Sequence, residues 1–151
     1  IEFARNVAGL LDANSREFNS HSANKVIDIM EGQIGCENTG GSMRLGAYEC
    51  VLKPGTRLAA AYDDAPSVME RHRHRYEFNN NYRELFTSLG LTLGGSSPDG
   101  ELIESVELDD KLFHLGVQYH PEFKSRPHRA HPLFKEFIRC SLVKRAEKDR
   151  R

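Results

Sequence analysis

Segments with the pattern of β-strands and segments with the pattern of helices are interleaved along this chain of 151 residues. Apolar residues between turn formers predict strands at Met43–Leu52, Leu102–Leu108 and Phe113–Tyr119. Helical spacing of apolar residues predicts one helix at Tyr82–Leu89 and another that begins at Pro132. Strands and helices mixed in this order favour an α/β domain with a central sheet.

Apolar residues recur at helical spacing from the first position of the chain, at Ile1, Ala4, Ala8 and Leu11. A helix normally begins after a capping residue, and none precedes Ile1. The first methionine is Met30. We therefore interpret the sequence as a fragment whose N-terminal part is missing.

Other segments lack a clear apolar period. Glu31–Ser42 holds four glycines and is predicted to be a flexible connection. Ser67–Arg75 is interpreted as a helix or loop that leads into an extended stretch. The charged residues 144–151 are expected to fray, which leaves residues 1–143 as the body of one domain.

Charge and cysteine content narrow the choice of function. With 21 Lys and Arg against 22 Asp and Glu, the net charge is −1, so no global field attracts nucleic acid or an anionic membrane. The odd number of cysteines, 3, favours reduced thiols over a disulfide framework. No apolar run approaches the ~20 residues of a membrane span. We expect a cytoplasmic protein with no membrane or nucleic-acid partner.

Gln118–Phe123 (QYHPEF) is the strongest candidate for chemistry. An apolar strand ends at His120, Pro121 stops further sheet pairing, and Glu122 returns within reach of the imidazole. A nucleophilic thiol needs a base, and the base needs a partner that fixes its tautomer, so this pair supplies two members of a catalytic triad. The alternative, which the spacing leaves open, is a surface histidine beside an incidental glutamate.

None of the three cysteines has the context of a nucleophile. Cys140 lies in the predicted C-terminal helix and Cys50 in a predicted strand, where a buried thiol behaves as a small apolar group. Cys36 follows a glycine, but Asn38 occupies the position where a nucleophile elbow needs a close-packing glycine. All three are interpreted as non-catalytic, and Cys36 is kept as the alternative.

A basic segment, Arg71–Glu77 (RHRHRYE), places three arginines at alternate positions. In an extended chain they lie on one side, where guanidinium groups can grip carboxylate or phosphate. His72 and His74 have the chemistry of metal ligands, but the flanking arginines repel a cation, so we expect no metal site. A solvated basic loop is the alternative.

Several segments together resemble the C-terminal class I glutamine amidotransferase domain of bacterial CTP synthases, namely Gly41–Cys50, Arg71–Tyr82, Ser97–Leu108 and Gln118–Phe137. HPEF alone indicates only a class I amidotransferase, whereas HRHRYE and HPEFKSRP are more specific to this family. The resemblance covers essentially the whole chain. It implies a flavodoxin-like α/β fold with a mostly parallel central sheet flanked by helices.

The resemblance also implies roles for individual residues. His120 matches the family's general base and Glu122 the carboxylate that orients it. Glu17 and Arg75 match residues that hold substrate glutamine, through its α-ammonium and α-carboxylate respectively. The family's catalytic cysteine would lie roughly two helical turns upstream of Ile1, so the chain alone is expected to be inactive.

In this family, ammonia from L-glutamine passes to a synthetase domain that makes CTP from UTP with ATP and Mg²⁺. GTP is the allosteric activator and the enzyme is a homotetramer, while no cofactor is implied for this fragment. Two alternatives stay open. One is another enzyme with the same half-site, such as the amidotransferase of GMP synthesis or a γ-glutamyl hydrolase. The other is a non-catalytic module that binds glutamine or a nucleotide.

Overall fold

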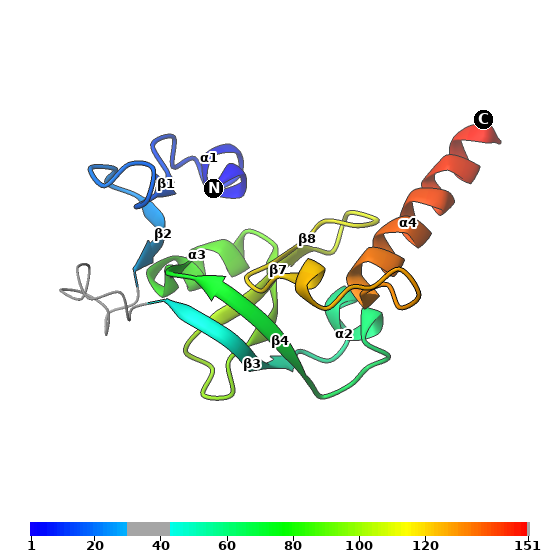
Figure 1. Ribbon diagram of the computed structural model, residues 1–151. Helices are drawn as coiled ribbons and strands as arrows, with labels where there is room; N and C mark the ends of the chain where they lie inside the picture. Colours follow the sequence, from blue (N-terminus) through cyan, green and yellow to red (C-terminus); the bar gives the residue numbers. More distant parts are fainter. Residues whose placement is uncertain (30–42, 151) are drawn as a thin grey trace.

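The computed structural model describes residues 1–29 and 43–150, which form an α/β fold (Figure 1). The strands are β1 Asn14–Ser15, β2 Lys25–Ile29, β3 Arg44–Leu52, β4 Ser67–His74, β5 Tyr76–Phe78, β6 Leu91–Ser96, β7 Ile103–Leu108 and β8 Leu115–Val117. The helices are α1 Glu2–Asn6, α2 Arg57–Ala61, α3 Arg83–Ser88 and α4 Pro132–Asp149, with short 3₁₀ helices η2 Asn80–Tyr82 and η3 Pro121–Phe123. A larger sheet has five strands in the order β4-β3-β6-β7-β8, and a smaller sheet has three in the order β1-β2-β5.

Antiparallel pairing predominates in both sheets. Every pair in the larger sheet is antiparallel, and so is the pair of β2 with β5. The expected parallel character is therefore only partial, since among the described strands β1 and β2 form the only parallel pair. The connections explain the difference: a tight turn at Ser97–Gly100 joins β6 to β7, and a short loop joins β7 to β8. Parallel neighbours would need longer crossover connections.

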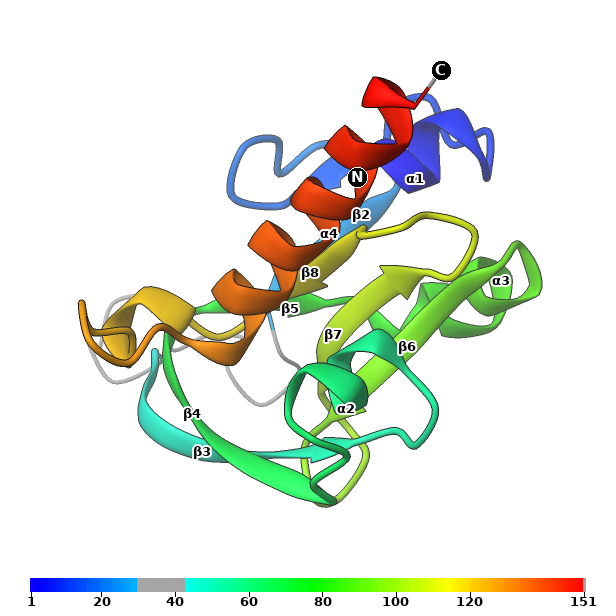
Figure 2. The ribbon, with the colours of Figure 1, turned by 90° about the vertical axis from the view of Figure 1, so that its right-hand side faces the viewer.

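Helices flank the larger sheet, as expected. One apolar cluster joins Leu58 of α2 and Leu133 of α4 to strand β3. A separate cluster joins Ala4 of α1 and Phe86 of α3 to strand β6. Figure 2 shows α2 and α4 together on the near side of the larger sheet. Within the described residues, no helix combines the length and the apolar character that crossing a membrane requires.

Strand β6 was not predicted from the sequence, because two glycines interrupt its apolar residues. The structure shows why they are there: a Cβ added to Gly95 would lie 2.7 Å from Sγ of Cys50 and 3.0 Å from Cδ2 of Leu58. A Cβ added to Gly94 would lie 2.7 Å from Oγ of Ser105. The glycines therefore allow α2 to pack closely on the sheet.

Ser67–Arg75, which was interpreted as a helix or loop, is almost entirely strand β4, so that prediction was wrong. β4 pairs with β3 along its whole length. Its inward positions include the buried polar residues Glu70 and His72, so the apolar alternation that marks a strand is missing.

The helices at the two ends of the chain also differ in extent from what the sequence patterns predict. The first helix ends at Asn6, although helical spacing of apolar residues continues to Leu11. The charged C-terminal segment, which was expected to fray, is helical as far as Asp149. The predicted flexible connection at Glu31–Ser42 lies outside the described residues.

Candidate functional site

His120 and Glu122 are brought together at the start of η3. Pro121 begins this 3₁₀ helix, and the turn returns Glu122 so that its Oε1 lies 2.7 Å from Nδ1 of His120. The hydrogen bond lowers the pKa of Glu122 below its ordinary value, so the ionised carboxylate accepts from Nδ1–H. Nε2 of a neutral His120 then carries no proton, which is the state that a general base requires.

The imidazole of His120 is both held and accessible. Its backbone N donates to the carbonyl of Arg71 at 2.9 Å, which ties it to β4. Its ring stacks on that of Phe123, with centroids 4.7 Å apart and planes at 14°. The side chain is nevertheless 35% exposed. Sequence reasoning missed Phe123, for which the only available signal was its place directly after the His-Pro-Glu turn.

Glu17 and Arg75 line one cavity of about 540 Å³. Glu17 follows β1, whereas Arg75 is the single residue between β4 and β5, where the chain passes from the larger to the smaller sheet. Gln118, two residues before His120, lines the same cavity, but among the described residues His120 and Glu122 do not line it. Arg73 also lines the cavity, so one carboxylate and two arginines share it, which suits a ligand with both a positive and a negative group.

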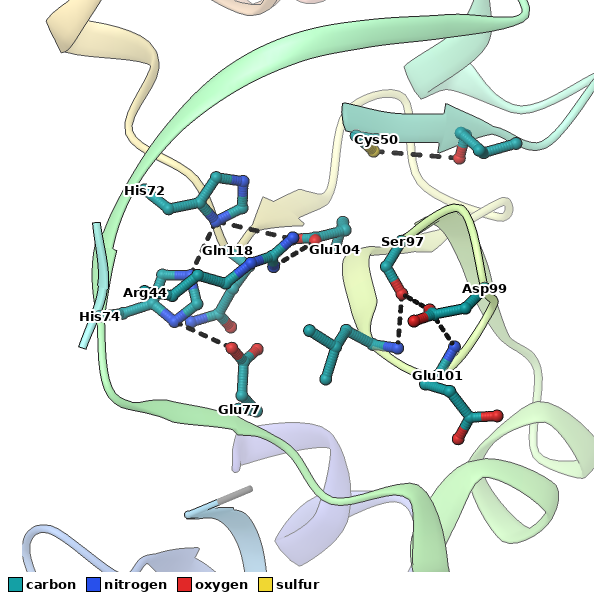
Figure 3. Close-up of polar contacts among 12 residues, drawn as sticks. Arg44, Cys50, His72, His74, Glu77, Ser97, Asp99, Glu101, Glu104 and Gln118 are labelled. Carbon is teal, nitrogen blue, oxygen red and sulfur yellow. Dashed lines mark hydrogen bonds and ion pairs between the residues drawn. The ribbon is translucent and has the colours of Figure 1, made fainter. Parts of the chain in front are cut away.

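Two inward side chains of β4, those of His72 and His74, belong to a buried polar cluster (Figure 3). Nδ1 of His72 lies 2.7 Å from Nε2 of His74, and Nδ1 of His74 lies 3.2 Å from Oε1 of Glu77. Glu104 pairs with Arg44 and places its Oε2 3.7 Å from Nδ1 of His72. Burial, with the charge of Arg44 nearby, lowers the pKa of His72 to about 3, so its imidazole is neutral.

The part of the basic segment that lies in β4, residues 71–74, is thus divided between the two faces of the strand, whereas Arg75 lies at the bend after it, so only two of the three arginines share one face of the strand. Arg71 and Arg73 are exposed on the face opposite the histidines, in agreement with the alternation expected of an extended chain. His72 and His74 form a hydrogen bond with each other. Within the parts of the chain that the structure describes, no three potential ligands are grouped so as to hold a metal ion.

Neither described cysteine has the character of a nucleophile. Cys50 is fully buried in β3, and burial raises the pKa of its thiol to about 12. Cys140 is buried in α4, where desolvation and the neighbouring Glu136 raise the pKa of its thiol. Both side chains are therefore protonated thiols at neutral pH. Cys36 lies outside the described residues.

Residues 3–140 match the class I glutamine amidotransferase family. The chain belongs to this family. The amidotransferase chain is 59% identical over 142 residues to the CTP synthase of Carboxydothermus hydrogenoformans, a match that covers 94% of this chain and 26% of that protein. It is 53% identical to the CTP synthase of Roseiflexus castenholzii over 152 residues, which cover 100% of this chain and 27% of the relative. The chain thus spans about a quarter of the length of these relatives.

Solved structures agree with this assignment. The glutaminase domain of Trypanosoma brucei CTPS, solved with bound acivicin, matches the amidotransferase chain with a TM-score of 0.87 and 36% identity, over 95% of this chain and 55% of that one. A putative GMP synthase subunit from Thermoplasma acidophilum matches 70% of this chain and 48% of its own, with a TM-score of 0.51 and 16% identity, which supports the fold alone. The expected class I amidotransferase fold and the resemblance to the glutaminase region of CTP synthases are both confirmed.

Proposed function

We propose that this chain is the glutamine-hydrolysing part of a CTP synthase. The observation that carries the proposal is the cavity shared by Glu17 and Arg75, because their charges complement the α-ammonium and α-carboxylate groups of glutamine. The hydrogen-bonded pair of His120 and Glu122 supports it, and so does the 59% identity to a CTP synthase.

In the proposed reaction, a cysteine thiol from outside this chain attacks the side-chain amide of glutamine. Nε2 of His120 takes the thiol proton and gives it to the departing ammonia, which leaves a glutamyl thioester. His120 then takes a proton from water as the water oxygen attacks the thioester, and returns it to the sulfur as glutamate is released. Glu122 holds the ring through Nδ1 and stabilises the imidazolium. Cys50, a buried thiol whose pKa is about 12, does not suit the nucleophile's role.

The released ammonia serves a synthetase region that converts UTP to CTP. ATP and Mg²⁺ act in that region, and no cofactor is assigned to this chain. GTP activates the enzyme, which is a cytoplasmic homotetramer, but no residue of this chain is assigned to GTP. These parts of the proposal rest on the similarity to CTP synthases alone.

A chimeric enzyme tests the proposal: this chain replaces the corresponding region of the Carboxydothermus hydrogenoformans CTP synthase. His120→Ala is expected to abolish CTP formation from glutamine and to preserve CTP formation from added ammonium chloride, because free ammonia bypasses the step that needs the base. His128→Ala, at an exposed histidine, is the control and should retain both activities. Continued glutamine hydrolysis by the His120→Ala enzyme would contradict the proposed function.

A further inference from the structure

Gln118 connects the two halves of the candidate site. Its side-chain Nε2 donates to the backbone carbonyl of Tyr76 at 3.0 Å, and its backbone N donates to the carbonyl of Glu104 at 2.8 Å. Tyr76 directly follows Arg75, and His120 comes two residues after Gln118. One amide side chain therefore ties the segment that leads to His120 to the bend that carries Arg75.

The bend at Arg75 is held from three directions. On the β4 side, His74 is fixed by its contact of 2.7 Å with His72. On the β5 side, Tyr76 pairs with Ile29 of β2 in the smaller sheet. Gln118 adds the contact that comes from the segment leading to the catalytic histidine. Figure 3 shows Gln118 among the side chains of the buried polar cluster. A bend between two sheets has no ladder of backbone hydrogen bonds of its own, so such side-chain contacts set the direction of the chain there.

We propose that Gln118 is a positioning residue for glutamine binding: by holding the carbonyl of Tyr76, it fixes the direction in which Arg75 enters the cavity. This inference rests on the proposed role of Arg75 in binding glutamine. Gln118 also lines the cavity, so direct contact with the ligand is a competing role, and general support of the fold is another. The three roles give different kinetic results in the chimeric enzyme.

Gln118→Met keeps the length of the side chain and removes the amide donor. The KM for glutamine is expected to rise roughly two- to tenfold, the range that one neutral hydrogen bond gives, with little change in kcat or in the ammonia-dependent rate. Gln118→Glu sets a carboxylate oxygen against the carbonyl of Tyr76 and is expected to raise KM further. Asn80→Leu is the matched control: it removes an amide that donates to the carbonyl of Glu101 at 2.5 Å, outside this cavity, and should leave KM unchanged.

A double-mutant cycle with Arg75→Lys separates the three roles. Lysine lacks the bidentate guanidinium group, so Arg75→Lys alone should raise the KM for glutamine. Adding Gln118→Met to Arg75→Lys should then raise KM by a smaller factor than Gln118→Met does in the unmodified enzyme. If Gln118→Met raised the KM for glutamine by the same factor in the unmodified enzyme and in the Arg75→Lys enzyme, the inference would be overturned. A loss of ammonia-dependent activity in Gln118→Met that matched its loss of glutamine-dependent activity would also overturn it. A raised KM in Arg75→Lys with an unchanged KM in Gln118→Met overturns the inference and leaves the proposed function standing. An unchanged KM in Arg75→Lys contradicts the proposed function and the inference together.

Discussion

Nδ1 of His120 and Oε1 of Glu122 lie 2.7 Å apart, with a single proline between the two residues. This contact is local, because the 3₁₀ turn that starts at Pro121 brings the carboxylate back to the ring. Glu17 and Arg75, in contrast, reach their common cavity from segments far apart in the sequence, the turn after β1 and the bend between β4 and β5. Mutations should therefore separate the chemistry of the base from the binding of glutamine.

Glu122→Gln tests the contact that orients the base. Glutamine keeps an acceptor oxygen but lacks the charge that stabilises imidazolium, so kcat with glutamine should fall by up to roughly 10⁴-fold, the loss caused by the corresponding change in a serine protease. KM should change little. Steady-state kinetics of the chimeric enzyme check this, with the exposed Glu101→Gln as control. An effect mainly on KM would instead make Glu122 a binding residue.

Arg75→Ala tests the binding of the α-carboxylate. A lost charged hydrogen bond is worth about 1.5–3 kcal/mol, so the KM for glutamine should rise on the order of tenfold or more. CTP formation from ammonium chloride should be largely unchanged, because ammonia does not use the cavity. Arg145→Ala, at an exposed position on α4, is the control. Equal damage to the glutamine- and ammonia-dependent activities would mean that Arg75 acts through the fold.

The chain as given should release no glutamate from glutamine. The two described cysteines have raised pKa values, so His120 has no suitable thiol among the described residues. An assay of glutamate release compares the chain, its Cys36→Ala variant and the chimeric enzyme, of which only the chimera should be active. Turnover by the chain that disappears in Cys36→Ala would identify Cys36 as the nucleophile and overturn the assignment of an external thiol.

Sequence patterns predicted elements in which apolar residues recur between turn formers or at helical spacing. Strands β7 and β8 and the start of α4 fall within the predicted segments for this reason, although Glu104 and Glu107 of β7 are themselves fully buried. Strand β4 was missed because Glu70 and His72 occupy its buried positions and are stabilised by polar partners from other elements. Such partners are known only once the chain has folded.

The same distinction applies to the candidate site. His120 and Glu122 were found by reasoning about residues alone, because a proline turn makes their contact local. The pairing of Glu17 with Arg75 came from the resemblance to a family, since no local pattern brings the turn after β1 and the bend after β4 to one cavity. Gln118 was not singled out, because its partner is a backbone carbonyl in a distant segment and leaves no mark on the sequence.

Gly95→Ala should destabilise the fold by about 1–3 kcal/mol, since overpacking forces neighbours to shift. The added Cβ would meet Sγ of Cys50 at 2.7 Å, so Cys50→Ala in the same protein should recover part of the loss. Gly116→Ala is the matched control, because its Cβ would make an ordinary contact of 3.5 Å with Val106. The stability of all three variants is measured as the midpoint of thermal inactivation of the glutaminase activity of the chimera. Equal midpoints for Gly95→Ala and Gly116→Ala would contradict this account of β6.

His72 should remain neutral through the pH range in which ordinary histidines titrate. Its pKa is about 3 in the folded chain against 6.5 for an unperturbed imidazole, because burial disfavours the charged ring. The unfolded state therefore binds more protons between these values, and the stability from this group, fully present above pH 6.5, is lost as the pH falls toward 3. The histidine NMR signal that vanishes in His72→Asn should show no titration near pH 6.5. A titration midpoint of this signal near pH 6.5 would show that the His72 ring is solvated.

The cavity that holds Glu17 and Arg75 has one wall on each sheet. The smaller sheet includes β1, which pairs with β2 through two residues only, Asn14 and Ser15. A ligand that contacts both walls links the two sheets. Any state in which the smaller sheet detaches loses those contacts and therefore the free energy of ligand binding. Occupancy of the cavity and the order of the smaller sheet are thus thermodynamically linked, so a ligand bound to both walls would stabilise the attachment of the smaller sheet.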